Sequence, residues 1–216
     1  MGIRLTKKAF IFDFDGTLVD SEQALYQCFQ SITKKLAPER IEYAKNILIG
    51  PPLRDAVSEI LGPEHQCLLD EFVRLFISMH DDQITHHTQP YPDVIPVLKQ
   101  LHAKNICMAI ATNKRFAPTK KLIDHFGWND YFLFIECSDS QSMMRNKDAM
   151  IQDIINQDKS FYGSYFIGDT VNDGLSANLN QLPFIKACYG YGHNQDWSKV
   201  KTYQEIHQFI EILNLI

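Results

Sequence analysis

The chain has 216 residues, and its 21 Lys and Arg against 26 Asp and Glu give a formal net charge of −5. Hydrophobic residues make up 45% and charged residues 22%, which is ordinary for a globular protein. No run of about 18 apolar residues occurs, so we expect no membrane-spanning helix and no membrane partner. The mild acidity argues against a nucleic-acid partner, because such proteins usually carry a basic patch.

The N-terminal segment and the cysteines predict a cytoplasmic protein. The apolar run after Lys8 reaches Asp13 and Asp15 too early to be the hydrophobic region of a signal peptide. The five cysteines form no C-x-x-C pair, and Cys107 and Cys137 lie inside apolar, strand-like runs. We therefore expect free thiols in a reducing compartment, and a redox or zinc protein is the least favoured alternative.

Short apolar runs alternate with amphipathic segments along most of the chain. The first run, A-F-I-F-D-F, is typical of a buried parallel strand and covers residues 9–14. Further strands are expected at residues 106–112, 132–137, 164–168 and 183–188. Apolar residues at helical spacing predict helices at residues 92–104, 118–126 and 147–156. The alternation predicts an α/β fold with a parallel sheet covered by helices on both faces.

This alternation is interrupted once, between Ser21 and about Thr88. The segment contains no convincing strand, and its pattern predicts helices separated by Pro and Gly residues. One helix is expected from about Pro52 to Leu61, and a second carries an apolar stripe between Leu68 and Ile77, which we interpret as helix packing. The sequence therefore predicts an all-helical insertion after the first strand.

Aspartates close two of the predicted strands. Asp13 and Asp15 end the first strand, and Asp169 and Asp173 follow the strand at residues 164–168. Reactive sites of open parallel sheets lie beyond the carboxyl ends of the strands, so these carboxylates are expected to converge. Such close carboxylates repel one another unless a cation such as Mg²⁺, which prefers oxygen ligands, lies between them. A role as turn formers or helix caps explains one cluster but not two at equivalent strand ends.

Two further strand or helix ends carry groups that suit a phosphate. The strand at residues 106–112 ends in Thr112, and this hydroxyl and the backbone N–H groups near Asn113 can hold phosphate oxygens. Lys147 opens a predicted helix, where a cation opposes the helix dipole unless it points at an anion. Alone, the first signal is weak because Thr and Asn are common helix caps, and Lys147 taken by itself is better explained as a surface lysine.

Together these residues resemble the haloacid dehalogenase superfamily of phosphotransferases. Its four motifs occur in order, as the run from Asp13 to Asp20, then Thr112-Asn113, then Lys147, then Gly168-Asp169 through Asp173. The helical insertion is similar to the family's cap domain. The resemblance implies a Rossmann-like catalytic core formed by residues 1–20 and 88–216, and a small helical cap formed by residues 21–87.

Within the superfamily the chain is most similar to the phosphoglycolate phosphatase group. Dehalogenases of the superfamily lack the second acid of the first motif, and Asp15 is present here, so a phosphatase is implied. The family usually has Pro after the motif lysine, where this chain has Asp148. It often has Ala-Gly before the last core strand, where this chain has Asn180-Gln181, although Asn tolerates a left-handed turn.

The resemblance assigns roles to the four aspartates. It implies that Asp13 is the nucleophile that forms an aspartyl-phosphate, and that Asp15 is the general acid and base. It places Mg²⁺ on Asp13, the backbone carbonyl of Asp15 and Asp169, with Asp173 binding the metal or orienting its water.

The resemblance also implies where the substrate binds. Thr112, Asn113 and Lys147 are expected to hold the phosphoryl group of a small phosphate ester, with phosphoglycolate as the first candidate. The cap is expected to close over the site. Arg54 follows Gly50-Pro51-Pro52-Leu53 and either reaches a substrate carboxylate or phosphate, or is a surface arginine.

Other functions remain compatible with the same motifs. A sugar-phosphate mutase of the superfamily would return the phosphoryl group to its substrate, although Thr17 follows the phosphatase pattern. A non-catalytic binding protein could keep the fold, although every motif residue is present. The sequence is compatible with a monomer or a homodimer.

Overall fold

The computed structural model describes residues 9–140 and 145–216 of the chain. Its main sheet has six parallel strands in the order β5-β4-β1-β6-β7-β8. The strands are β1 Phe10–Phe12, β4 Met108–Thr112, β5 Phe134–Cys137, β6 Tyr165–Gly168, β7 Phe184–Ala187 and β8 Gln204–Ile206. All five predicted strands are confirmed, and β8 is an addition.

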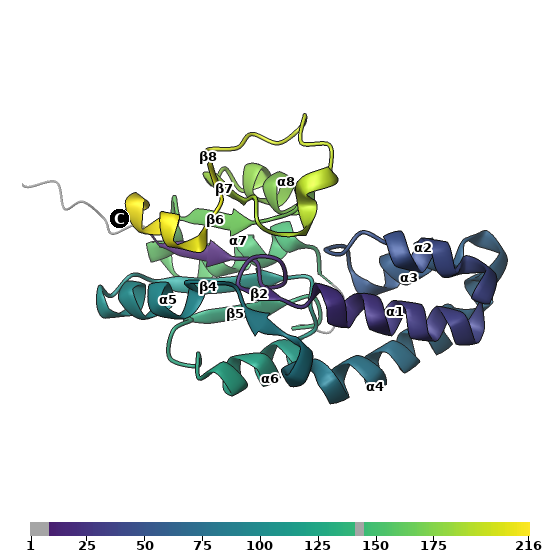
Figure 1. Ribbon diagram of the computed structural model, residues 1–216. Coiled ribbons are helices and arrows are strands. Elements are labelled where there is room, and N and C mark those ends of the chain that lie inside the picture. Colours follow the sequence, from purple (N-terminus) through teal and green to yellow (C-terminus); the bar gives the residue numbers. More distant parts are fainter. Residues whose placement is uncertain (1–8, 141–144) are drawn as a thin grey trace, which may run out of the picture.

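Helices cover both faces of this sheet, as expected for the α/β fold (Figure 1). Phe10 and Phe12 point to one face, where they share a core with α5 and α6. Ile11 points to the other, where it shares a core with α7 and α8. The period of two along β1 therefore anchors both layers. The four helices are α5 Val94–Ala103, α6 Phe116–Phe126, α7 Lys147–Gln157 and α8 Val171–Leu179.

The register of the sheet decides which residues meet at its carboxyl edge. Phe12 pairs with Ile110 of β4 on one side and with Ile167 of β6 on the other. The segments that follow these three strands therefore begin at the same level of the sheet. They contain most of the predicted site residues.

The insertion consists of helices with a core of their own (Figure 1). Its elements are α1 Glu22–Leu36, α2 Ile41–Asn46, α3 Leu53–Leu61 and α4 Leu69–His87. Phe29, Val57 and Phe72 belong to an apolar cluster that contains no residue of the sheet. The short antiparallel strands β2 Val19–Asp20 and β3 Gln89–Pro90 flank the insertion. This arrangement supports the predicted boundaries between core and cap, at residues 20/21 and 87/88. The division into two domains stays a prediction.

Shorter elements complete the described part of the chain. They are the 3₁₀ segments Pro38–Arg40, Pro63–Leu68, Lys159–Phe161, Tyr191–Asn194 and Phe209–Leu215. The turn between α8 and β7 differs from expectation in one detail, because its left-handed residue is Gln181 with φ 58°, whereas Asn180 has φ −85°. No helix within the described ranges is both long and apolar enough to cross a membrane.

Candidate active site

Three aspartates meet at the carboxyl edge of the sheet. Asp13 follows β1, Asp169 follows β6, and Asp173 lies in the first turn of α8. Each offers a carboxylate oxygen, and these oxygens lie within 4.8 Å of one another. The side chains are buried, with exposed fractions of 5%, 1% and 0% respectively. The structure therefore brings together three of the four predicted metal ligands as a buried group.

Lys147 lies between two of these carboxylates. Its Nζ atom is 2.7 Å from Oδ1 of Asp13, and it also donates to Oδ1 of Asp173. The lysine is the first residue of α7, as predicted, and its side chain is 2% exposed. Burial alone would lower the pKa of Lys147, but the two carboxylates outweigh it and raise the pKa. The anions that this lysine faces are thus acidic side chains of the site.

Asp173 also fixes the start of α8. Thr170 is the N-cap residue, and its hydroxyl accepts a hydrogen bond from the backbone N–H of Asp173. Oδ2 of Asp173 accepts bonds from the backbone N–H of Thr170 at 2.8 Å and from its hydroxyl at 2.6 Å. The capping box therefore fixes Oδ2 of Asp173, while Oδ1 accepts the hydrogen bond from Lys147. Asp173 thus caps α8, as the alternative interpretation expected, and also lies in the acidic group, while its role toward a metal stays a prediction.

The electrostatics of the cluster favour an added cation. Burial is the main cause that raises the pKa of Asp13 to about 7, with a further contribution from Asp173. Burial and the charges of Asp173 and Asp13 raise the pKa of Asp169 well above its ordinary value. Four carboxylates of the site face two lysine ammonium groups, which leaves two excess negative charges when all are ionised. A divalent cation matches this excess, and the oxygen donors match a hard cation.

Asp15 is held by a partner that the sequence analysis did not assign. Nζ of Lys114 lies 3.0 and 3.1 Å from the two carboxylate oxygens of Asp15, and the hydroxyl of Ser21 donates to Oδ1 at 2.5 Å. Lys114 is 6% exposed. The pair joins positions 99 residues apart, and only the adjacency of β1 and β4 creates it. In the sequence, this pair is indicated only by the run Thr112-Asn113-Lys114 at the end of β4.

Close backbone approach at two glycines positions Asp169. A Cβ atom at Gly16, whose φ is +82°, would lie 2.3 Å from Oδ2 of Asp169, and one at Gly190 would lie 2.3 Å from its Cβ. The carboxylate also accepts hydrogen bonds from the backbone N–H of Tyr191 at 2.7 Å and from the hydroxyl of Thr17 at 3.2 Å. Only glycine leaves room for this arrangement.

The remaining predicted site residues, Thr112, Asn113 and Arg54, line one cavity together with Asp13 and Asp15. Thr112 is 2% exposed, and its hydroxyl accepts a hydrogen bond from the backbone N–H of Lys114. The side-chain amide of Asn113 donates to the backbone carbonyl of Gly50 at 2.9 Å and so links the core to the insertion. Arg54 is half exposed and forms an ion pair with an exposed aspartate of α4.

A cavity of about 250 Å³ joins these parts. Asp13, Asp15 and Thr112 line its core side, and residues of α1, α3 and α4 line the opposite side. The site therefore has an acidic floor on the sheet and a wall made by the helical insertion.

Comparison with known families agrees with this fold. A family model described as haloacid dehalogenase-like hydrolase matches residues 10–187, and the chain belongs to this family. It is 26% identical over 226 residues to a phosphoglycolate phosphatase from Psychrobacter arcticus, covering 98% of this chain and 96% of that protein. It is 29% identical over 195 residues to a phosphoglycolate phosphatase from Rhodobacter capsulatus, with 85% of each chain covered.

Solved structures show the same fold. A haloacid dehalogenase-like hydrolase from Streptococcus pneumoniae matches with a TM-score of 0.80 and 22% identity, covering 97% of this chain and 98% of that chain. A predicted phosphoglycolate phosphatase from Haemophilus somnus matches with a TM-score of 0.82 and 21% identity, covering 98% and 99%.

Proposed function

We propose that the protein is a Mg²⁺-dependent phosphatase that hydrolyses a small phosphate monoester through an aspartyl-phosphate on Asp13. The observation that carries the proposal is that Asp13 lines the cavity and that Asp169 and Lys147 lie directly beside it. The phosphoglycolate phosphatases among the relatives make phosphoglycolate the reference ester.

Two carboxylates divide the covalent chemistry. Asp13 lines the cavity and attacks phosphorus, forming the oxygen–phosphorus bond as the ester oxygen leaves. Asp15 lies two residues further on and lines the same cavity. It donates a proton to the leaving oxygen and then accepts one from the water that hydrolyses the intermediate. Lys114 and Ser21 contact the Asp15 side chain and fix its position.

The buried carboxylates fit a resident Mg²⁺ ion. Asp13, Asp169 and Asp173 would hold it with the backbone carbonyl of Asp15, and the closeness of their oxygens and their excess negative charge support this set. When bound, the ion offsets negative charge so that an anionic carboxylate can approach an anionic phosphate. Gly16 and Gly190 hold Asp169 at the required place.

Three further residues hold the transferring phosphoryl group. We assign the Thr112 hydroxyl, the backbone N–H of Asn113 and the Lys147 ammonium to its oxygens, where charge accumulates during transfer. The bond from Asn113 to the Gly50 carbonyl ties this site to the cap. The cap, residues 21–87, excludes water from the cavity.

The test is phosphate release from phosphoglycolate and a panel of other esters, with and without Mg²⁺, by wild type and Asp13→Asn. The proposal predicts Mg²⁺-dependent release that falls by at least about a thousandfold in the variant. Activity that survives in Asp13→Asn would contradict it. Transfer of phosphate back to substrate, seen by phosphorus NMR, would indicate a mutase, and a wild type without activity would indicate a binding protein.

A further inference from the structure

The cap wall of the cavity is apolar. Its lining from α1, α3 and α4 includes Leu25, Phe29, Leu53, Val73, Phe76 and Ile77. The cavity volume is about 250 Å³. An apolar cavity of about 150 Å³ already binds benzene, so a group of that size fits here beside a phosphate.

Three lining residues that could carry a positive charge are already paired or neutral. Lys114 is held by Asp15, and Nη2 of Arg115 lies 2.6 and 2.8 Å from the carboxylate oxygens of Asp81. Burial, followed by the charge of Lys114, lowers the pKa of His80, so this ring is neutral at pH 7. None of these groups offers a free positive charge to a second anionic group of a substrate.

The remaining cation of the lining lies at the exposed rim. Nη2 of Arg54 is 2.8 Å from Oδ1 of Asp70, and the two side chains are 51% and 86% exposed. A carboxylate placed against the apolar wall would lose its hydration without gaining a cation, which is strongly unfavourable.

We propose that the leaving group of the substrate is an uncharged, mainly apolar alcohol, of about the size of a benzyl group, seated against the wall formed by α1, α3 and α4. This inference rests on the proposed phosphatase function and narrows its substrate class. Burying such a group contributes about a tenfold to hundredfold gain in kcat/KM over an ester that cannot use the wall.

The test compares kcat/KM for benzyl phosphate, ethyl phosphate and phosphoglycolate in wild-type enzyme with Mg²⁺. We expect benzyl phosphate to exceed both of the others by at least about tenfold. In Val73→Lys, which adds a cation to the wall, the ratio is expected to shift toward phosphoglycolate by at least about tenfold. Met79→Lys is the matched control, because Met79 is exposed on the same helix outside this lining and should leave the ratio unchanged.

The outcomes separate this inference from the function on which it rests. Hydrolysis of phosphoglycolate in preference to benzyl phosphate would overturn the substrate class and leave the phosphatase function intact. An unchanged ratio in Val73→Lys would also overturn it. Absence of Mg²⁺-dependent release from every ester would overturn the phosphatase function, and the substrate class with it.

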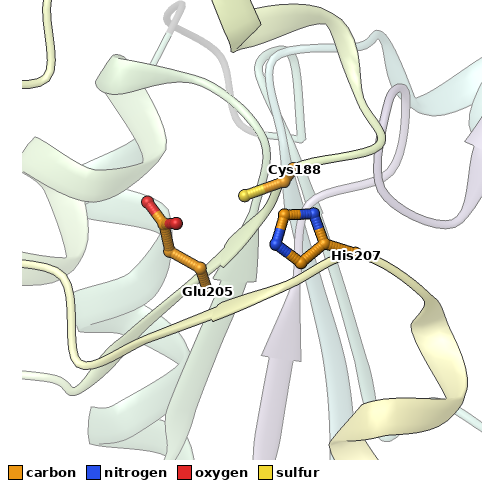
Figure 2. A group of neighbouring side chains, drawn as sticks. All are labelled: Cys188, Glu205 and His207. Carbon is orange, nitrogen blue, oxygen red and sulfur yellow. The ribbon is translucent and has the colours of Figure 1, made fainter.

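A second, independent group of potential metal ligands lies at the edge of the sheet. Ala187 of β7 pairs with Ile206 of β8, and the backbone N–H of Cys188 donates to the Ile206 carbonyl at 2.8 Å. Side chains alternate along a strand, so Glu205 and His207 share the face opposite Ile206. Figure 2 shows both beside Cys188. Their potential ligand atoms lie within 4.8 Å of the cysteine sulfur and of one another.

The donor set of this group differs from that of the acidic site. Thiolate, imidazole and carboxylate together suit Zn²⁺, whose tetrahedral sites often leave one position for water. Oε1 of Glu205 accepts a hydrogen bond from Lys186 at 2.9 Å, and the Glu205 carboxylate also interacts with the Cys188 thiol, whose proton a bound metal would replace. Glu205 and His207 are exposed, so an ion can enter from solvent. We infer that Cys188, Glu205 and His207 bind a Zn²⁺-class cation, with the thiol proton released to water.

Cobalt(II) is the probe for this site, because a thiolate ligand adds a charge-transfer absorption that carboxylates do not give. We expect the band in wild type and in Cys67→Ala, which removes an exposed cysteine elsewhere. It should vanish in Cys188→Ala, and His207→Gln should weaken cobalt binding by at least about tenfold. Absence of the band in wild type, or its persistence in Cys188→Ala, would overturn the assignment.

Discussion

The two sides of the central cavity are built in opposite ways. The core side carries aspartates and lysines at strand ends and helix starts, each held by ion pairs, backbone N–H groups or a close glycine. The cap side consists of apolar side chains on helices, with its cation Arg54 at the exposed rim. Under the proposed function, the core would determine the reaction, whereas the cap would determine which ester is used.

The two sides also differ in how their residues are placed. Strand register puts the core groups at one level, since Phe12 pairs with both neighbouring strands. The cap residues depend on helix packing around a separate apolar cluster. Changes on the core side should therefore affect stability and every substrate together, and changes on the cap side should affect selectivity.

The largest expected effect comes from Lys147→Met. The change leaves buried Asp13 and Asp173 without their shared cation, and we expect a loss of about 3–5 kcal/mol in the free energy of unfolding at pH 8 without metal. Urea denaturation measures it. Lys120→Met removes an exposed ion pair with Asp124 and should lower the free energy of unfolding by less than about 1 kcal/mol. Equal losses in the two variants would contradict the contrast between buried and exposed charges.

Gly16→Ala should come next in size. Its Cβ would meet the Asp169 carboxylate at 2.3 Å, so we expect a stability loss of about 2–4 kcal/mol and loss of phosphate release from every ester. Gly127→Ala is the matched control, because Gly127 also has positive φ, of +70°, but has no atom within 4 Å of a Cβ. Gly127→Ala should lower the free energy of unfolding by about 1 kcal/mol and leave the rate of phosphate release unchanged. Normal activity in Gly16→Ala would show that the approach to Asp169 is dispensable.

The raised pKa of Asp13 predicts a pH dependence of stability. With its pKa at about 7 when folded and 3.8 ordinarily, the folded state binds more protons in between. The free energy of unfolding without metal should therefore fall as pH rises from about 4 to about 7. Denaturation in EDTA should show this slope in wild type, and Asp13→Asn should reduce it. Added Mg²⁺ should restore stability at pH 7 and above. Identical slopes in the two proteins would refute the pKa assignment.

The smallest effect is expected for Arg54→Ala on the cap rim. Its ion pair with Asp70 is exposed, so the free energy of unfolding, measured by urea denaturation, should change by less than about 1 kcal/mol. If the cap selects an uncharged alcohol, kcat/KM for benzyl phosphate should stay within about threefold of wild type. A much larger loss would place Arg54 in contact with the substrate and weaken the separation of roles between core and cap.

Much of the core could be predicted from the sequence because its signals are local. Five apolar runs gave five of the six parallel strands, and the acidic residues after β1 and β6 predicted a convergence that the structure shows. The two-residue strands β2 and β3 were missed because so short a segment has no periodicity. The strand β8, Gln204–Ile206, was missed because it lies in a polar segment at the sheet edge.

Contacts between distant segments could not be predicted in the same way. The pair of Lys114 with Asp15 requires β4 to lie beside β1, and the group around Cys188 requires the register of β7 and β8. The apolar stripe of α4 was interpreted as packing, and this is correct for Phe72, which is buried in the cap core. Val73 and Ile77 of the same stripe line the cavity, a difference that depends on how the cap helices are arranged.

The most direct test of the central claim is to trap the covalent intermediate. Wild type and Asp13→Asn would be mixed with Mg²⁺ and a hydrolysed ester, quenched in acid, digested and analysed by mass spectrometry. The account predicts one phosphoryl group on Asp13 in wild type and none in the variant. Mg²⁺-dependent phosphate release by a wild type whose phosphoryl group is trapped on another residue would contradict it.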